Sequence, residues 1–270
     1  MYREFYKLNK KAFSKTPDPE FVFWNETYEE AIARLMYTAE EKEIGLLTGE
    51  IGTGKTLLTR VLIDRLIDDR YNIAVILNPQ LSPGQFLRTV AREYNIEKPK
   101  YYKADLYLQL QDFLFEEYEN NIKPLLIIDE AQLIPSKKVF DEIRLLSNFQ
   151  MDDENLIGII LVGQPELAKR LNHKAYRPLT QRIGADFNLE AMNLEYTQYY
   201  IIARLEKAGA SYKIFSDESI ELIHKYSGGI PRVINHIATQ SLLEGAYKKE
   251  KIITEEIIEN IVKSMRFING

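Results

Sequence analysis

The chain has 270 residues, of which 45% are hydrophobic and 28% charged, and its 40 acidic and 35 basic side chains give a net charge of −5. This is the composition of an ordinary globular protein, and it excludes a strongly basic nucleic-acid coat protein, so any contact with DNA must come from a local patch. The chain has no cysteine, which excludes disulfides and thiolate metal sites. It also has no apolar run near the roughly 20 residues needed to cross a membrane. Both observations favour a cytoplasmic location.

Short apolar runs that do not alternate with polar residues predict strands buried on both faces, as in a parallel sheet covered by helices. These runs are Ile44–Leu47, Ile73–Leu77, Leu125–Ile128 and Ile157–Val162. Amphipathic stretches between them predict helices over Lys55–Asp68, Leu106–Tyr118 and Val139–Phe149. Strands that alternate with helices indicate right-handed βαβ crossovers and an α/β core.

The pattern changes after about Glu190, because no strand-like run follows. The remaining chain predicts helices over about Glu195–Ala208, Asp217–Tyr226, Pro231–Lys248 and Glu255–Lys263. Gly209 is a suitable stop for the first of these helices, and Thr254 is a suitable cap for the last. We therefore expect an α/β core over residues 1–190 and a small all-helical lid domain over residues 191–270.

A glycine-rich segment follows the first predicted strand and opens a helix: Gly49-Glu50-Ile51-Gly52-Thr53-Gly54-Lys55-Thr56. This is the context that a phosphate-binding loop requires. Glycines let main-chain N–H groups wrap a phosphate without Cβ clashes, and a helix N-terminus favours an anion. We expect Lys55 to reach the β- and γ-phosphates of ATP, Thr56 to ligate Mg²⁺, and Leu57 to end the binding segment.

Two carboxylates end the buried run Leu125–Ile128. Asp129 is suited to hold Mg²⁺ through its water shell, and Glu130 is suited to polarise the attacking water. This pair favours hydrolysis of ATP over phosphoryl transfer to a substrate, and it argues against a Ras-like GTPase. The three histidines of the chain do not have metal-ligand spacing.

With these motifs the chain resembles the AAA+ ATPases of the ExeA/GspA type, in the broad group that includes the transposition regulators TnsC and TniB. The resemblance covers nearly the whole chain, and it rests on FYKLNKKAFSKTPDPEFVF, LLTGEIGTGKT, LLIIDEAQ, EIRLLSNFQ, ILVGQPEL, LTQRI and SGGIPRVIN. It implies a P-loop NTPase core of the AAA+ kind, with a parallel αβα sheet, followed by a helical lid.

The resemblance also implies roles for single residues. Gln164 is similar to the sensor-1 residue that reads the γ-phosphate. Arg182 is similar to the arginine finger that reaches the ATP of a neighbouring subunit, and Arg177 is the second candidate.

Arg232, within Gly228-Gly229-Ile230-Pro231-Arg232, is similar to sensor 2. Pro231 marks a first helical turn, where a cation is disfavoured by the helix dipole unless an anion such as a triphosphate compensates. The resemblance further implies that the N-terminal segment contributes to the adenine pocket, with core packing as the alternative role for Phe13, Pro17 and Phe23.

A finger that acts in trans makes each ATP site a subunit interface, so we expect self-assembly into a ring or a helical filament. The first candidate for the biological role is a regulator like TnsC or TniB, which assembles on duplex DNA and engages a transposase-like partner. A secretion or pilus-assembly ATPase of the ExeA/GspA type is the second, although the chain shows neither the membrane segment nor the peptidoglycan-binding part of those proteins. The third is a nucleotide-dependent scaffold with slow hydrolysis.

Basic residues near the core predict where DNA would be touched. Candidate contacts are Lys98, Lys100, Tyr101 and Lys103 in a predicted loop between helices, and Lys137 and Lys138 after the acidic pair. An ordinary solvated surface is the alternative for both groups.

Overall fold

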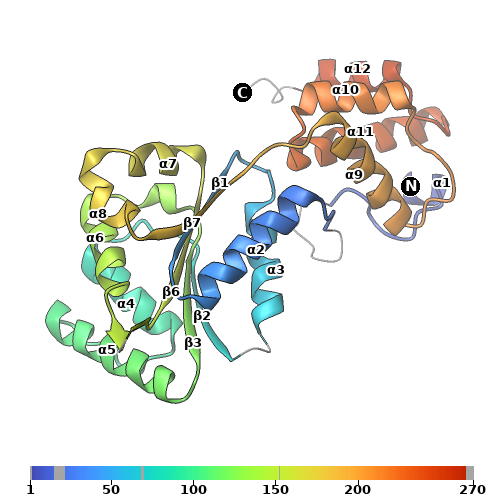
Figure 1. The fold of residues 1–270 in the computed structure, drawn as a ribbon. Helices are drawn as coiled ribbons and strands as arrows, with labels where there is room; N and C mark the ends of the chain where they lie inside the picture. Colours follow the sequence, from blue (N-terminus) through green and yellow to red (C-terminus); the bar gives the residue numbers. More distant parts are fainter. Residues whose placement is uncertain (1, 15–21, 68–69, 152, 266–270) are drawn as a thin grey trace. The chain divides into compact units, whose positions relative to one another are not determined.

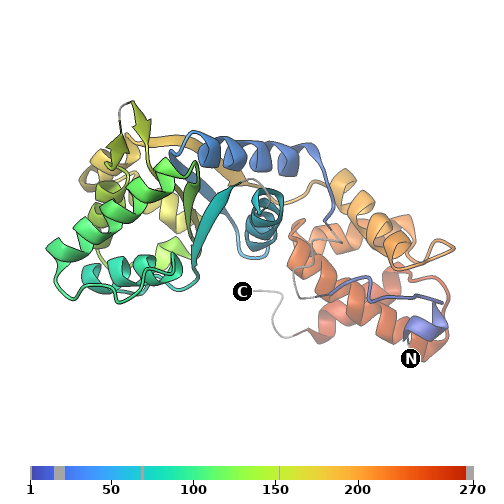
Figure 2. The same ribbon diagram turned by 90° about the horizontal axis from the view of Figure 1, so that it is seen from below.

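The computed structural model describes residues 2–14, 22–67, 70–151 and 153–265. Its contacts divide the chain into two compact units (Figures 1 and 2). The sheet unit comprises Glu26–Gly49 and Leu58–Leu189, and the helical unit comprises Met1–Asn25, Glu50–Leu57 and Glu190–Gly270. The predicted division at residue 190 therefore coincides with one of several points at which the chain passes between the units.

A five-stranded parallel sheet with strand order β2-β3-β6-β1-β7 forms the centre of the sheet unit. Its strands are β1 (Ile44–Gly49), β2 (Tyr71–Ile76), β3 (Lys123–Ile128), β6 (Gly158–Gly163) and β7 (Ile183–Leu189). β1 and β6 are buried at every position and β3 at all but its first, as their uninterrupted apolar sequences predict. A separate antiparallel pair is formed by β4 (Gln150–Met151) and β5 (Glu154–Asn155).

Helices cover both faces of this sheet. Figures 1 and 2 show α2 and α3 on one face and α4, α5 and α6 on the other. The bounds are α2 (Glu26–Glu40), α3 (Lys55–Leu66), α4 (Pro83–Glu93), α5 (Lys103–Glu119), α6 (Lys137–Leu146), α7 (Pro165–Leu171) and α8 (Arg177–Thr180), with 3-10 turns at Ala131–Leu133 (η2) and Lys174–Tyr176 (η3). The main hydrophobic core includes Phe86, Leu106 and Phe140 from α4, α5 and α6, and Leu126 and Ile159 from the sheet.

Strand β7 was not predicted from the sequence. Its residues are only partly buried at alternate positions until Leu189, because it is an edge strand that pairs with β1. An edge strand of this kind has no uninterrupted apolar run, which is the signal that identified the other strands.

The helical unit carries the helices predicted for the C-terminal part of the chain. They are α9 (Leu194–Lys207), α10 (Asp217–Ser227), α11 (Pro231–Lys248) and α12 (Glu255–Ser264). Gly209 follows α9 with a φ of +95°, which confirms it as the stop. Thr254 occupies the N-cap position of α12, but its side chain makes no capping hydrogen bond.

The contacts of the N-terminal segment group it with the helical unit, whereas we expected it within the α/β core over residues 1–190. It begins with the short helix α1 (Tyr2–Phe5). The Arg204 guanidinium donates to the carbonyl oxygen of Ala12 at 3.0 Å, and the Thr239 hydroxyl donates to that of Phe13 at 3.1 Å. The reason is that an irregular segment needs partners for its main-chain carbonyls, and α9 and α11 supply them.

The aromatic residues named for the adenine pocket have packing contacts in the same unit. Phe13 is 5% exposed, and its ring centroid lies 6.3 Å from that of Phe215. Phe23 packs edge-on against Tyr200 with a centroid distance of 6.0 Å. Pro17 lies outside the described residues.

Candidate active site

The glycine-rich loop has the backbone conformation that its sequence predicts. Gly52 and Gly54 have φ angles of +88° and +110°, which L side chains rarely adopt. A Cβ atom on Gly52 would also lie 2.7 Å from the Cβ of Arg232. Glycine is thus required at Gly52 both by conformation and by space.

The side chains of the loop converge on one main-chain oxygen. The Lys55 ammonium donates to the Glu50 carbonyl at 2.9 Å, and the Thr53 hydroxyl donates to the same oxygen at 2.9 Å. Lys55 is only 7% exposed and begins α3, with Thr56 and Leu57 following it in the first turn. A buried ammonium beside main-chain amides at a helix N-terminus is the donor set that a triphosphate requires.

Arg232 lies beside this loop within the helical unit. Its main-chain N–H donates to the Gly52 carbonyl at 3.3 Å, and its exposed side chain leaves from the first turn of α11. The start of α11 is fixed by Gly229, which has a φ of +74° and whose Cβ would lie 1.9 Å from the Met192 carbonyl oxygen. The structure therefore brings the predicted sensor-2 residue to the predicted phosphate loop.

The acidic pair follows β3 in the sheet unit. Asp129 is 6% exposed, and its Oδ1 atom accepts the main-chain N–H of Glu130 at 2.8 Å. Glu130 has a φ of +52° and a ψ of 37°, a left-handed conformation that costs a residue with a side chain about 1–3 kcal/mol. Such strain is typical of functional positions, and here it turns the chain sharply from the strand into the 3-10 turn η2.

Polar side chains surround the Glu130 carboxylate. Its Oε2 atom accepts from Nε2 of Gln164 at 3.3 Å and from Nε2 of Gln132 at 2.5 Å. Gln164 follows β6, the neighbour of β3, so two carboxyl ends of parallel strands supply this cluster. The sequence predicted Glu130 and Gln164 separately, and the structure joins them. Gln132 was missed, although it is the last residue of the LLIIDEAQ segment.

The two arginine-finger candidates lie elsewhere on the sheet unit. Arg182 is exposed and immediately precedes β7, and its Nη1 atom donates to the Ser147 carbonyl at 3.3 Å. In the parallel pairing of β1 with β7, Ile183 pairs with Ile44, which opens β1. Arg182 is therefore at the amino edge of the sheet, whereas Glu130 is at the carboxyl edge. Arg177 begins α8 and is exposed.

The basic-aromatic residues of the α4–α5 loop are strongly exposed. Tyr101 and Tyr102 are 79% and 71% exposed, and their rings meet edge to face at 5.5 Å. The Arg88 guanidinium lies 5.6 Å from the centroid of the Tyr101 ring. Lys98 and Lys100 are in the same loop, so this surface combines cationic and aromatic groups.

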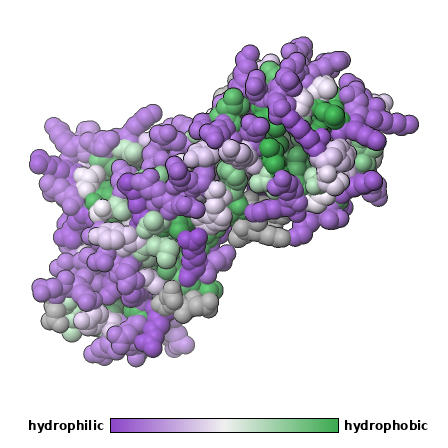
Figure 3. Space-filling view, turned by 45° about the vertical axis from the view of Figure 1, so that its right-hand side comes forward, coloured by the Kyte–Doolittle hydropathy of each residue, from purple (hydrophilic) through white to green (hydrophobic). Residues whose placement is uncertain are grey.

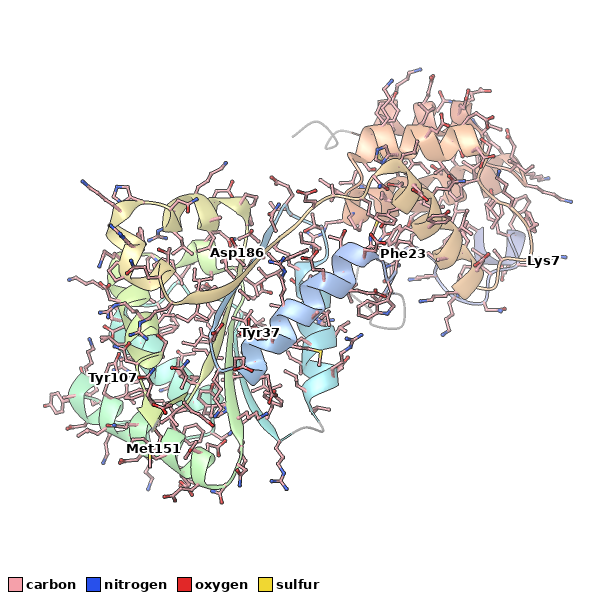
Figure 4. The ribbon with its side chains drawn as sticks, in the orientation of Figure 1. Lys7, Phe23, Tyr37, Tyr107, Met151 and Asp186 are labelled. Carbon is pink, nitrogen blue, oxygen red and sulfur yellow. The ribbon has the colours of Figure 1, made fainter. Side chains whose placement is uncertain are left out.

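The other lysines named as candidate DNA contacts include two that pair with carboxylates. Lys103 Nζ lies 2.6 Å from Oε1 of Glu142, a side chain that is only 5% exposed. The Tyr107 hydroxyl donates to Oε2 of Glu142 at 3.0 Å. Figure 4 shows Tyr107 on the α5 side of the sheet unit. Burial is the main cause that raises the pKa of Tyr107, and the Glu142 carboxylate adds to the effect.

Lys137 donates to both carboxylate oxygens of Asp141, one turn further along α6, at 2.8 Å. Its neighbour Lys138 is exposed.

Within residues 2–14, 22–67, 70–151 and 153–265, no group of three or more histidine or acidic side chains is placed to hold a metal ion. In the same ranges no helix has the length and apolar character needed to cross a membrane. The face in Figure 3 is mostly hydrophilic, with apolar residues in smaller patches.

Comparison with known proteins gives matches over most of the chain. Residues 38–171 match the family described as AAA domain. General secretion pathway protein A of Aeromonas hydrophila is 34% identical over 261 residues, which cover 95% of this chain but 47% of that protein. The chain thus spans about half the length of this relative.

Solved structures share the fold at lower identity. The ORC2 protein of Aeropyrum pernix, in ADPNP-ADP complexes, has a TM-score of 0.67 at 18% identity, covering 95% of this chain and 72% of that one. The RuvB Holliday junction branch migration motor of Thermotoga maritima has a TM-score of 0.56 at 20% identity, covering 94% of this chain and 73% of that one.

Proposed function

Because this chain belongs to the AAA+ ATPases of the ExeA/GspA type, we propose that it hydrolyses ATP at sites that are completed between copies of itself. The assembled form serves as the ATPase module of a secretion or assembly machine in the cytoplasm. The main support for self-assembly is the position of Arg182 at the amino edge of the sheet, opposite the edge at which Glu130 lies. The support for the pathway is the 34% identity to general secretion pathway protein A over 95% of the chain.

Each residue has a chemical role in this proposal. The amides of Glu50–Gly54 and the Lys55 ammonium would bind the phosphates, and Arg232 would add a second cation. Thr56 and Asp129 would hold Mg²⁺, which would neutralise part of the negative charge of the phosphates. A set of one hydroxyl and one carboxylate fits this ion, because Mg²⁺ usually keeps several waters and takes its remaining oxygens from the phosphates.

Glu130 would hold and polarise the attacking water in this scheme, and Gln164 would sense the γ-phosphate. The left-handed backbone of Glu130 and the hydrogen bond from Gln164 support these roles, because both fix the position of the carboxylate.

Arg182 would complete the ATP site of a neighbouring copy. Strand β7 has 7 residues, so it separates its two ends by about 20 Å at roughly 3.3 Å per residue. An arginine side chain is far too short to cover that length. Arg182 is therefore useful for catalysis only when another copy of the chain presents its ATP, which makes hydrolysis depend on assembly.

Subunit mixing tests this proposal. The wild-type chain should hydrolyse ATP, Lys55→Ala should not bind it, and Glu130→Gln should bind it without turnover. Arg182→Ala and Lys55→Ala are each expected to be inactive alone, but their mixture should recover activity, because one supplies the loop and the other supplies the arginine. Failure to recover activity at any ratio would contradict action in trans, and Arg177→Ala should then be mixed in the same way.

A DNA-associated regulator similar to TnsC or TniB, acting with a transposase-like partner, is the second candidate. The strong exposure of Tyr101 and Tyr102, in a loop that also holds Lys98 and Lys100, favours it, because bases can stack on exposed aromatic rings while nearby cations contact the phosphates. Stimulation of ATP hydrolysis by duplex DNA that weakens with salt, and that a Lys98→Ala/Lys100→Ala variant abolishes, would select this candidate. A rate of ATP hydrolysis that does not change with DNA would favour the secretion-type ATPase module over the DNA-associated regulator.

A further inference from the structure

The side chain of Gln132 bridges two predicted site residues, and its orientation is fixed by chemistry. Its Oε1 atom accepts the main-chain N–H of Gln164 at 3.1 Å. A main-chain N–H is a donor only, so the amide oxygen must be the atom that faces it. The Nε2 atom then faces the Glu130 carboxylate, and it donates to Oε2 at 2.5 Å.

The position of Gln132 depends on space left by Gly163 at the end of β6. A Cβ atom on Gly163 would lie 2.8 Å from Oε1 of Gln132 and 2.7 Å from Cδ2 of Leu167. Gly163 is not among the residues with a positive φ, so its backbone does not require glycine. The lack of a side chain at this position is explained by the room that Gln132 and Leu167 occupy.

The two glutamine amides bind the same carboxylate oxygen. Gln132 and Gln164 both donate to Oε2 of Glu130, and neither donates to Oε1. A glutamate side chain has three rotatable bonds, and fixing one oxygen with two donors selects one orientation of the carboxylate. The other oxygen is then presented in a defined direction.

We propose that Gln132 is a positioning residue, which aims Oε1 of Glu130 at the attacking water and ties the carboxylate to Gln164. This inference rests on the proposed role of Glu130. Its physical basis is that misplacement of a reacting group by about 1 Å can cost about 100-fold in rate. Gln132 has no part in binding the phosphates in this scheme, so its loss should act on kcat and leave KM nearly unchanged.

Steady-state kinetics of three variants provide the first test. Gln132→Met keeps the length of the side chain and removes its hydrogen bonds, and Gln132→Ala removes the side chain. Both should lower kcat about 10-fold or more, with KM within about twofold of wild type. Leu133→Ala is the matched control, because Leu133 is the next residue of the same turn and is 40% exposed. It should leave both constants unchanged.

The outcomes separate this inference from the proposed function. If Gln132→Met turns over at the wild-type rate while Glu130→Gln is inactive, Glu130 keeps its role and the inference about Gln132 is wrong. If Glu130→Gln turns over at the wild-type rate, the role of Glu130 itself fails.

Side-chain amide resonances give a second readout that needs no nucleotide. In ¹H–¹⁵N spectra of the full chain, Glu130→Ala should shift the side-chain NH₂ signals of both Gln132 and Gln164, because both donate to this carboxylate. Gln132→Met should shift the main-chain amide signal of Gln164, which loses its acceptor. Signals that stay in place in both variants would overturn the hydrogen-bonded arrangement and the inference with it.

Discussion

Replacement of Gly52 by alanine tests whether the loop must hold the conformation seen here to bind ATP. Two costs can be worked out from the structure. The φ of +88° lies outside the range that L residues prefer, which costs about 1–2 kcal/mol. The new methyl group would lie 2.7 Å from the Cβ of Arg232, and overpacking of this kind costs about 1–3 kcal/mol.

Both costs should appear as lost affinity for ATP. A loop in the free protein can relax to escape the strain, whereas a bound triphosphate requires the original conformation. The sum of about 2–5 kcal/mol corresponds to an affinity for ATP that is at least about 30-fold weaker. Isothermal titration calorimetry with ATP and Mg²⁺ measures the affinity, and far-UV circular dichroism with thermal unfolding checks that the chain remains folded.

Gly228→Ala is the matched control for this experiment. Gly228 also has a positive φ, +57°, but a Cβ atom there would meet no other atom within 4 Å. This variant should lose about 1 kcal/mol of stability at the end of α10 and keep its affinity for ATP. A Gly52→Ala protein that is folded and binds ATP within twofold of wild type would refute the argument from conformation and space.

Two further predictions concern stability. Lys103→Met should lower the free energy of unfolding by about 1–3 kcal/mol in urea denaturation, because it removes a charged partner from the buried Glu142 carboxylate; adding Glu142→Gln should restore part of the loss. Hydrogen bonds from Lys123 and then Tyr71 hold the pKa of Glu40 below its usual value. The stability that the Glu40 carboxylate contributes is therefore present above its unfolded-state pKa and is lost as the pH falls through its folded-state pKa. Glu40→Gln should cost less than about 1 kcal/mol at pH 7, and a cost that persists at acid pH would contradict this assignment.

The parts of the fold that sequence predicted are those where burial is uniform. The runs that became β1, β3 and β6 are apolar without interruption because both faces of these strands are covered. The edge strand β7 was missed because only alternate residues are partly buried. Bounds of helices such as α11 were predicted well because Pro231 marks its start.

Some parts of the candidate site are set by residues that are adjacent in the sequence, and others depend on distant residues that meet only in the fold. The phosphate loop is encoded in eight consecutive residues, and the acidic pair is encoded by a strand and the two residues after it. Gln132 and Gln164 are 32 positions apart, and they meet because β3 and β6 are neighbours in the sheet. Strand order is not visible in a single sequence, so the bridge between these residues could not be predicted even though both side chains stand in recognised motifs. The same limit applies to the N-terminal segment, whose partners are more than 180 positions away.

The strain at Glu130 decides which substitution is informative there. Its left-handed backbone costs about 1–3 kcal/mol, and the hydrogen bonds to Asp129 and from the two glutamines oppose that cost. Glu130→Gln keeps one acceptor oxygen that can receive the Gln132 amide, so the turn should hold its geometry while the charge on the side chain is lost. Glu130→Ala removes both acceptors and frees the turn to relax, which mixes a loss of chemistry with a change of shape. We therefore expect Glu130→Gln to keep the thermal stability of wild type within a few degrees and Glu130→Ala to fall below it. Equal unfolding temperatures for the two variants would show that the glutamine bonds contribute nothing to the turn.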